Sequence, residues 1–88
     1  MTREQAAAAV ARAITTLARE GALPAAYGET PPPFDIDVGR LSIDSVALIS
    51  LLTEVEVQAG VGIPEQRLER VRTLADLAAL VAELGSSR

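Results

Sequence analysis

Residues 44–59, with the sequence DSVALISLLTEVEVQA, carry apolar side chains at helical spacing on two faces. One stripe, at spacings of three and four, consists of Leu48, Leu51, Leu52, Val55 and Ala59. A second stripe consists of Val46, Ile49, Thr53 and Val57. We predict one helix here, with Asp44 as its N-cap, because a carboxylate is favoured at the positive end of the helix dipole. One stripe is enough to pack a helix onto a small core, so the second predicts a surface with another use.

Upstream of this helix the sequence predicts another helix and a long connection. Residues 2–20 are rich in alanine, and Thr2 with Gln5 three residues later forms a capping-box pattern. In the connection, residues 21–43, three successive prolines at 31–33 exclude a helix. We predict an ordered loop held on the helices rather than a disordered interdomain linker, because it carries too many apolar groups for a solvated linker. These groups are Leu23, Phe34, Ile36, Val38, Leu41 and Ile43.

Downstream, two further helical segments are predicted. Pro64 suits the first position of a short third helix, or a single turn, over residues 65–70, because its missing N–H is harmless there. Thr73 caps the last helix, with Asp76 three residues later in a capping-box-like arrangement, and Gly85 closes it. The buried stripe of that helix consists of Leu74, Leu77, Ala78, Val81 and Leu84.

Length and composition limit both fold and function. The 88 residues predict a single domain, residues 1–88, and an all-α fold: a small four-helix bundle of three principal helices and one short helix, with a long ordered first loop. The chain has no cysteine, histidine or lysine, which excludes disulfides, thiolate and imidazole catalysis, Schiff bases and His/Cys metal sites. A net charge of −4 argues against nucleic-acid binding. No stretch has the length and apolar character of a membrane span or a signal peptide, so we expect a cytoplasmic protein.

Two groups of charged residues have simple interpretations. Asp35, Asp37 and Gly39 superficially match a calcium-binding loop. With Asp35 as the first position of such a loop, positions 5 and 12, which should supply acidic ligands, are Gly39 and Val46, so we expect no metal site. A small basic cluster consists of Arg67, Arg70 and Arg72. We interpret this cluster as a solvated face that could contact an acidic partner.

Ser45 is the residue with the most chemical interest. It follows Asp44 at the start of a helix, where both residue types are common for capping reasons alone. Without histidine, lysine or cysteine in the chain, Ser45 cannot be a self-activated nucleophile, so any chemistry on it must come from another protein. A helix N-terminus also favours a phosphate diester, because its N–H groups and dipole attract negative charge. A simple helix cap and a site of covalent modification both remain open on these residues alone.

Three blocks of the sequence resemble the acyl carrier protein and peptidyl carrier protein family. Residues 41–46, LSIDSV, are similar to the family's apolar-Gly-apolar-Asp-Ser-Leu motif. Residues 62–65, GIPE, are similar to its short segment before helix three, and residues 72–77, RTLADL, to the Thr-apolar-x-Asp opening of its last helix. With the first helix and the long loop, the resemblance covers nearly the whole chain.

The resemblance implies a carrier rather than an enzyme. Ser45 would be the attachment point of 4′-phosphopantetheine, transferred from coenzyme A by a separate phosphopantetheinyl transferase with Mg²⁺, and the arm would hold acyl or aminoacyl groups as thioesters. Asp44 would help to position Ser45 and meet an arginine or the metal in the transferase. The second stripe, Val46, Ile49, Thr53 and Val57, would be a docking face for partner enzymes. The other partners would be a loading ligase or acyltransferase and a ketosynthase, condensation or tailoring enzyme.

Departures from the family pattern indicate the pathway. Ser42 replaces a common glycine and Val46 replaces the usual leucine, and the second helix carries only Glu54 and Glu56 after Asp44. The resemblance therefore implies polyketide or nonribosomal peptide biosynthesis rather than housekeeping fatty acid synthesis, in a freestanding, monomeric protein. The cargo is not specified by the sequence. The alternative is an unmodified helical adaptor or regulatory module that binds a partner through the same stripe.

Overall fold

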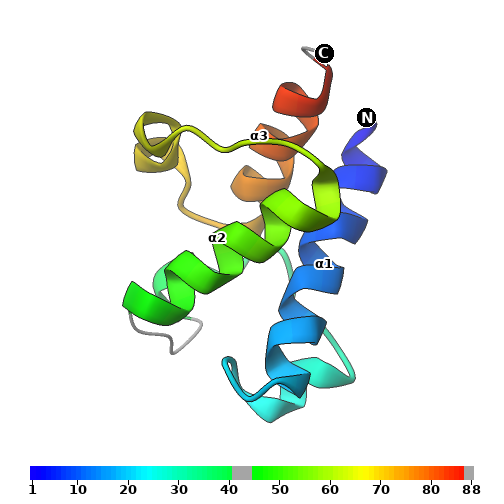
Figure 1. The fold of residues 1–88 in the computed structure, drawn as a ribbon, viewed down its shortest axis with the longest axis vertical. Helices are drawn as coiled ribbons and strands as arrows, with labels where there is room; N and C mark the ends of the chain where they lie inside the picture. Colours follow the sequence, from blue (N-terminus) through cyan, green and yellow to red (C-terminus); the bar gives the residue numbers. More distant parts are fainter. Residues whose placement is uncertain (41–44, 87–88) are drawn as a thin grey trace.

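The computed structural model describes residues 1–40 and 45–86, with the backbone alone for Ser45 and Ser86. The described residues form three α-helices and three short 3₁₀ helices, joined by loops, and no strand. They are α1 (Arg3–Arg19), η1 (Ala25–Gly28), η2 (Val38–Arg40), α2 (Ser45–Ala59), η3 (Glu65–Arg70) and α3 (Leu74–Ser86). Figure 1 shows α2 crossing in front of α1 and α3. The predicted all-α bundle of three principal helices is confirmed, and η1 and η2 are additional turns within the long loop.

Helix α1 is the central element, because it packs against both α2 and α3. Its buried face is rich in alanine, which allows the neighbouring helices to approach closely; the buried residues are Ala6, Ala9, Val10, Ala13, Ile14, Leu17 and Ala18. The predicted capping box is present: the Gln5 N–H donates to Thr2 Oγ1 (3.1 Å) and the Thr2 N–H to Gln5 Oε1 (2.8 Å). Gly21, at φ 87°, ends the helix in the left-handed conformation that glycine adopts without strain.

The two stripes of α2 have opposite environments, as their spacing predicted. On the inner face, Leu51 and Val55 are completely buried in the core that α1 and α3 also line. On the outer face, Val46, Ile49 and Val57 are 71%, 63% and 71% exposed. The predicted N-cap, Asp44, lies outside the described residues. The helix therefore uses one stripe for the fold and leaves the other on the surface.

The long connection is ordered over its described part, as predicted. Leu23 is buried, and Phe34, Ile36 and Val38 are half-buried against the core. Leu41 and Ile43, the other two apolar residues that were expected to hold this loop, lie outside the described residues. The interpretation as a disordered linker is wrong for residues 21–40, because their apolar side chains pack on the helices.

Two predicted boundaries near the C-terminus need correction. Pro64, at φ −64°, stands just before η3 rather than at its first position, and residues 65–70 form a 3₁₀ helix. Gly85 does not close the last helix, since α3 continues to Ser86. The glycine has a different role: a Cβ added there would lie 2.8 Å from Met1 Cβ, so its lack of a side chain makes room for the N-terminal residue.

Candidate functional site

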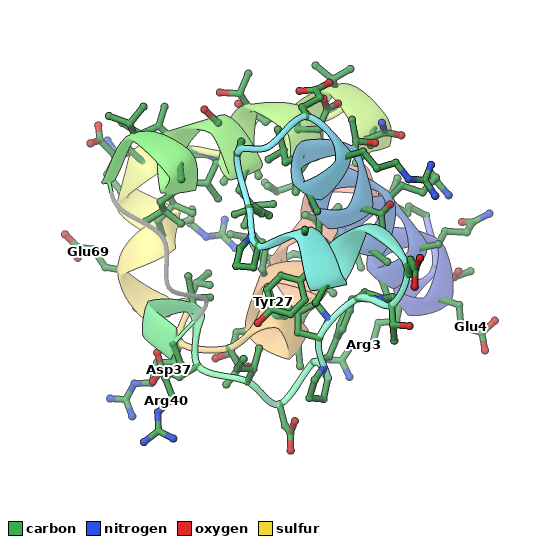
Figure 2. The ribbon with its side chains drawn as sticks, turned by 90° about the horizontal axis from the view of Figure 1, so that it is seen from below. Arg3, Glu4, Tyr27, Asp37, Arg40 and Glu69 are labelled. Atoms are coloured by element: carbon green, nitrogen blue, oxygen red, sulfur yellow. The ribbon has the colours of Figure 1, made fainter. Side chains whose placement is uncertain are left out.

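Ser45 is the first residue of α2. In both views this end of α2 lies at an edge of the fold, away from α1 (Figures 1 and 2). The positive end of a 15-residue helix dipole is therefore available where the sequence places its candidate modification site. Asp44, the predicted N-cap and positioning residue, and the side chain of Ser45 lie outside the described residues, so both roles of Asp44 stay predictions.

The chain segment that leads toward Ser45 is anchored on the start of α3. The Leu74 N–H donates to the carbonyl of Ile36 (3.3 Å), and the Ala75 N–H donates to the carbonyl of Phe34 (2.8 Å). These are the first two N–H groups of α3, which have no partner within their own helix. The loop thus supplies acceptors to α3, and α3 fixes the course of the loop. We call residues 34–40 the anchored segment.

A second set of bonds fixes the far end of the anchored segment. The Val38 N–H donates to the carbonyl of Arg72 (2.8 Å). Asp37 then stabilises η2: its Oδ1 accepts from the Gly39 N–H and its carbonyl from the Arg40 N–H, both at 2.8 Å. Figure 2 shows Asp37 and Arg40 together at one edge of the molecule. The backbone is therefore held up to the last described residue before Ser45.

The cap of α3 completes this arrangement. The Asp76 N–H donates to Thr73 Oγ1 at 3.1 Å, and Asp76 Oδ2 accepts from the N–H groups of Arg72 and Thr73, each at 3.1 Å. The predicted Thr73–Asp76 capping arrangement is confirmed. These two backbone N–H groups, Arg72 first, lower the pKa of Asp76, with smaller contributions from the Thr73 hydroxyl and the Arg72 charge.

The outer face of α2 is apolar and lies directly after Ser45. We call Val46, Ile49, Thr53 and Val57 the exposed stripe; all four are exposed. The two glutamates of α2 are engaged elsewhere. Glu56 Oε2 accepts from the Ile63 N–H (2.9 Å), and Glu54 Oε2 accepts from Gln58, whose Oε1 accepts in turn from Arg12 of α1 (both 3.3 Å). The acidic groups of α2 thus serve the fold, and the exposed stripe carries no charge.

The basic cluster is a solvated face in which one arginine also serves the fold. Arg70 and Arg72 are exposed, but Arg67 is half-buried and forms an ion pair with Glu83 of α3, with 2.7 Å between Nη2 and Oε1. Arg67, Arg70 and Glu83 line an open hollow of about 220 Å³ between η3 and α3, and Asp76 forms part of its wall. All three arginines reach solvent, as predicted, and Arg67, whose side chain is 42% exposed, is in addition paired with Glu83 within the fold.

The sequence predicted the capping arrangement of α3 but not the hydrogen bonds between the start of α3 and the anchored segment. Thr73 and Asp76 were visible as a capping pattern, whereas the acceptors for the next two N–H groups are the backbone carbonyls of Phe34 and Ile36. A carbonyl belongs to every residue and gives no sequence signal. The apolar alternation of Phe34, Ile36 and Val38 was the available hint, because it marks an extended segment with one face on the core.

The described parts of the chain hold no group of three or more His, Cys, Asp or Glu side chains that could bind a metal ion, and no helix there could cross a membrane. What the site offers is a serine at a helix N-terminus, an uncharged apolar surface beside it and a backbone held by hydrogen bonds. A phosphate diester fits this position, because the positive end of the helix dipole favours its charge.

Comparison with known proteins agrees with this chemistry. The family model described as the phosphopantetheine attachment site matches residues 27–81, from η1 through most of α3. The match includes Ser45, the exposed stripe and the cap of α3. No curated protein and no solved structure matches the chain.

Proposed function

Since the chain belongs to the family of phosphopantetheine-binding carrier domains, to which 4′-phosphopantetheine is covalently attached, we propose that Ser45 is its attachment residue. The position of Ser45 at the N-terminus of α2 carries this proposal. Within the matched range the other serines are Ser42 and Ser50. Ser50 is half-buried in the second turn of α2, away from the positive end of the helix. Ser45 combines the helix terminus with a preceding aspartate.

The chain's own residues bring a hydroxyl and a docking surface, while another protein performs the attachment. In that step the hydroxyl oxygen of Ser45 forms a phosphodiester bond with the pantetheine phosphate of coenzyme A, and adenosine 3′,5′-bisphosphate leaves. The hydroxyl proton passes to a base of the transferase, because the chain has no histidine or lysine to accept it. We propose that Asp44 helps to position Ser45 and meets an arginine or the Mg²⁺ ion of the transferase. When attached, the arm supplies a thiol that holds acyl or aminoacyl groups as thioesters.

The exposed stripe is the proposed docking face for the partner enzymes. Exposed apolar side chains that lie together in one row, unlike those scattered singly, mark an interaction surface. Val46 and Ile49 lie within the first two turns after Ser45, so an enzyme that works on the arm would contact them. The acidic side chains Glu54 and Glu56 are engaged within the fold. This uncharged stripe supports a role in polyketide or nonribosomal peptide biosynthesis, where we place the protein.

Mass spectrometry tests the attachment site. The purified chain is incubated with coenzyme A, Mg²⁺ and a broad-specificity phosphopantetheinyl transferase, and its intact mass is measured. We expect the gain of one phosphopantetheine for the wild type, for Ser42→Ala and for Ser50→Ala, and none for Ser45→Ala. An unchanged wild-type mass would favour the unmodified adaptor, and a gain that persists in Ser45→Ala would assign the arm to another residue.

A further inference from the structure

We propose that Asp76 and Thr73 are positioning residues for the modification of Ser45, acting through the anchored segment, residues 34–40. This inference rests on the proposed function of Ser45. Neither residue is close to Ser45 in the sequence, and neither lies on α2. Their influence passes along hydrogen bonds from the start of α3 to η2, which ends five residues before Ser45.

The first step of the path is the N-terminus of α3, where all four initial N–H groups have identified acceptors. Two are local: the Asp76 N–H donates to Thr73 Oγ1 and the Leu77 N–H to the Thr73 carbonyl, both at 3.1 Å. The N–H groups of Leu74 and Ala75 donate to carbonyls of the anchored segment. The segment is therefore half of the cap of α3, and the two parts are stabilised together.

The second step is the carboxylate of Asp76. By accepting from the N–H groups of both Arg72 and Thr73, it fixes the backbone of these two residues ahead of the helix. The carbonyl of Arg72 then accepts from the Val38 N–H, and Thr73 forms an isolated antiparallel bridge with Asp37. Without the carboxylate, the acceptor for Val38 would lose its fixed orientation.

The third step is the register of the anchored segment. Phe34, Ile36 and Val38 are half-buried against the core, whereas Asp35 and Asp37 between them are exposed. A shift of the segment by one residue would bury the carboxylates and expose the apolar side chains. The hydrogen bonds and the alternation of apolar and acidic residues therefore permit only one register of the segment against α3. The segment ends in η2 at Arg40, five residues before Ser45.

The consequence for modification is a change in population. In this proposal the position of Ser45 depends on the anchored segment, so a transferase binds only molecules in which that segment is in place. Loosening the segment lowers the competent fraction, which raises the apparent KM for the carrier and leaves kcat unchanged. By contrast, a variant with lower global stability that still remains folded would have unchanged KM and kcat.

The experiment compares two capping boxes of the same kind. Asp76→Ala removes the reciprocal residue of the α3 box, and Gln5→Ala removes its counterpart in the α1 box, whose two hydrogen bonds join only Thr2 and Gln5. We expect Asp76→Ala to raise the transferase KM measurably at unchanged kcat, by at most the fivefold factor that corresponds to about 1 kcal/mol for one lost cap. Gln5→Ala should leave both constants at the wild-type values. Asp76→Asn, whose amide oxygen can accept the same bonds, should restore most of the KM.

Hydrogen exchange of the unmodified protein separates this inference from the proposed function. Asp76→Ala should speed amide exchange of Val38, Leu74 and Ala75, and Gln5→Ala should not. Equal exchange in the two variants would overturn the inference even if Ser45 is modified normally. So would equal KM values in the two alanine variants. Failure of the wild type to gain mass overturns the proposed function instead, and the exchange comparison does not depend on it.

Discussion

Ile49 and Leu51 lie two positions apart on α2, and the structure assigns them opposite environments. Ile49 is 63% exposed, whereas Leu51 is completely buried. Replacing each with glutamate places the same charge on the same helix, once in water and once in the core. The pair therefore tests whether the exposed stripe serves docking and the inner stripe serves folding.

The magnitudes follow from burial. Complete burial of an isoleucine or leucine side chain contributes about 1.5–3 kcal/mol, so the buried third or so of Ile49 contributes only about 0.5–1 kcal/mol. We expect Ile49→Glu to lower Tm by no more than about 8 °C. Leu51→Glu loses the full contribution and also buries a carboxylate, at a total cost of about 5 kcal/mol or more. A chain of this size has a stability of roughly 4–13 kcal/mol, so Leu51→Glu should either unfold the chain or lower its Tm by about 20 °C or more.

Circular dichroism and transferase kinetics measure the two effects. Ile49→Glu should keep the wild-type helical spectrum while its KM with the transferase rises about 5- to 30-fold, the loss expected for an apolar anchor worth about 1–2 kcal/mol. Loss of the helical signal in Ile49→Glu would show that the two stripes are assigned to the wrong faces. A folded Ile49→Glu with the wild-type KM would refute the docking role and leave the fold assignment intact.

Two further predictions concern stability. Gly60→Ala should lower the free energy of unfolding by about 1–2 kcal/mol in urea titrations, because φ is 69° there; Gly62→Ala, which has space for a Cβ, should leave it unchanged, and equal effects would contradict this reasoning. The pKa of Asp76 is lowered by the N–H groups of Arg72 and Thr73, so its contribution to stability is present above the unfolded-state pKa of about 3.9 and is lost as the pH falls through the folded pKa. Lowering the pH from about 6 to 3 should therefore reduce the Tm of the wild type more than the Tm of Asp76→Asn, as measured by thermal unfolding. An equal reduction in Tm would contradict the role of the Asp76 cap.

Local sequence was sufficient for most of the helices and for the candidate site. The capping boxes at Thr2 and Thr73 link residues three apart, so their hydrogen bonds can be inferred from spacing alone. The two stripes of α2 follow from helical periodicity in the same way. Gly85 was predicted to close α3, but the helix continues to Ser86, and the glycine instead leaves room for Met1, which comes from the other end of the chain and is reported by no local pattern.

The amino-acid sequence by itself determined the helices, the two faces of α2 and the choice of Ser45 as the candidate attachment residue, because each depends on side chains within a few residues of one another. Only the tertiary structure decided that Asp76 of α3 holds the segment ahead of Ser45, and that Glu54 and Glu56 are engaged within the fold and leave the exposed stripe uncharged. These features arise from contacts between the Ile36 carbonyl and the Leu74 N–H, or between the side chains of Arg12 and Gln58, which are distant along the chain. Backbone groups are alike in every residue, so their partners become known only when the chain has folded.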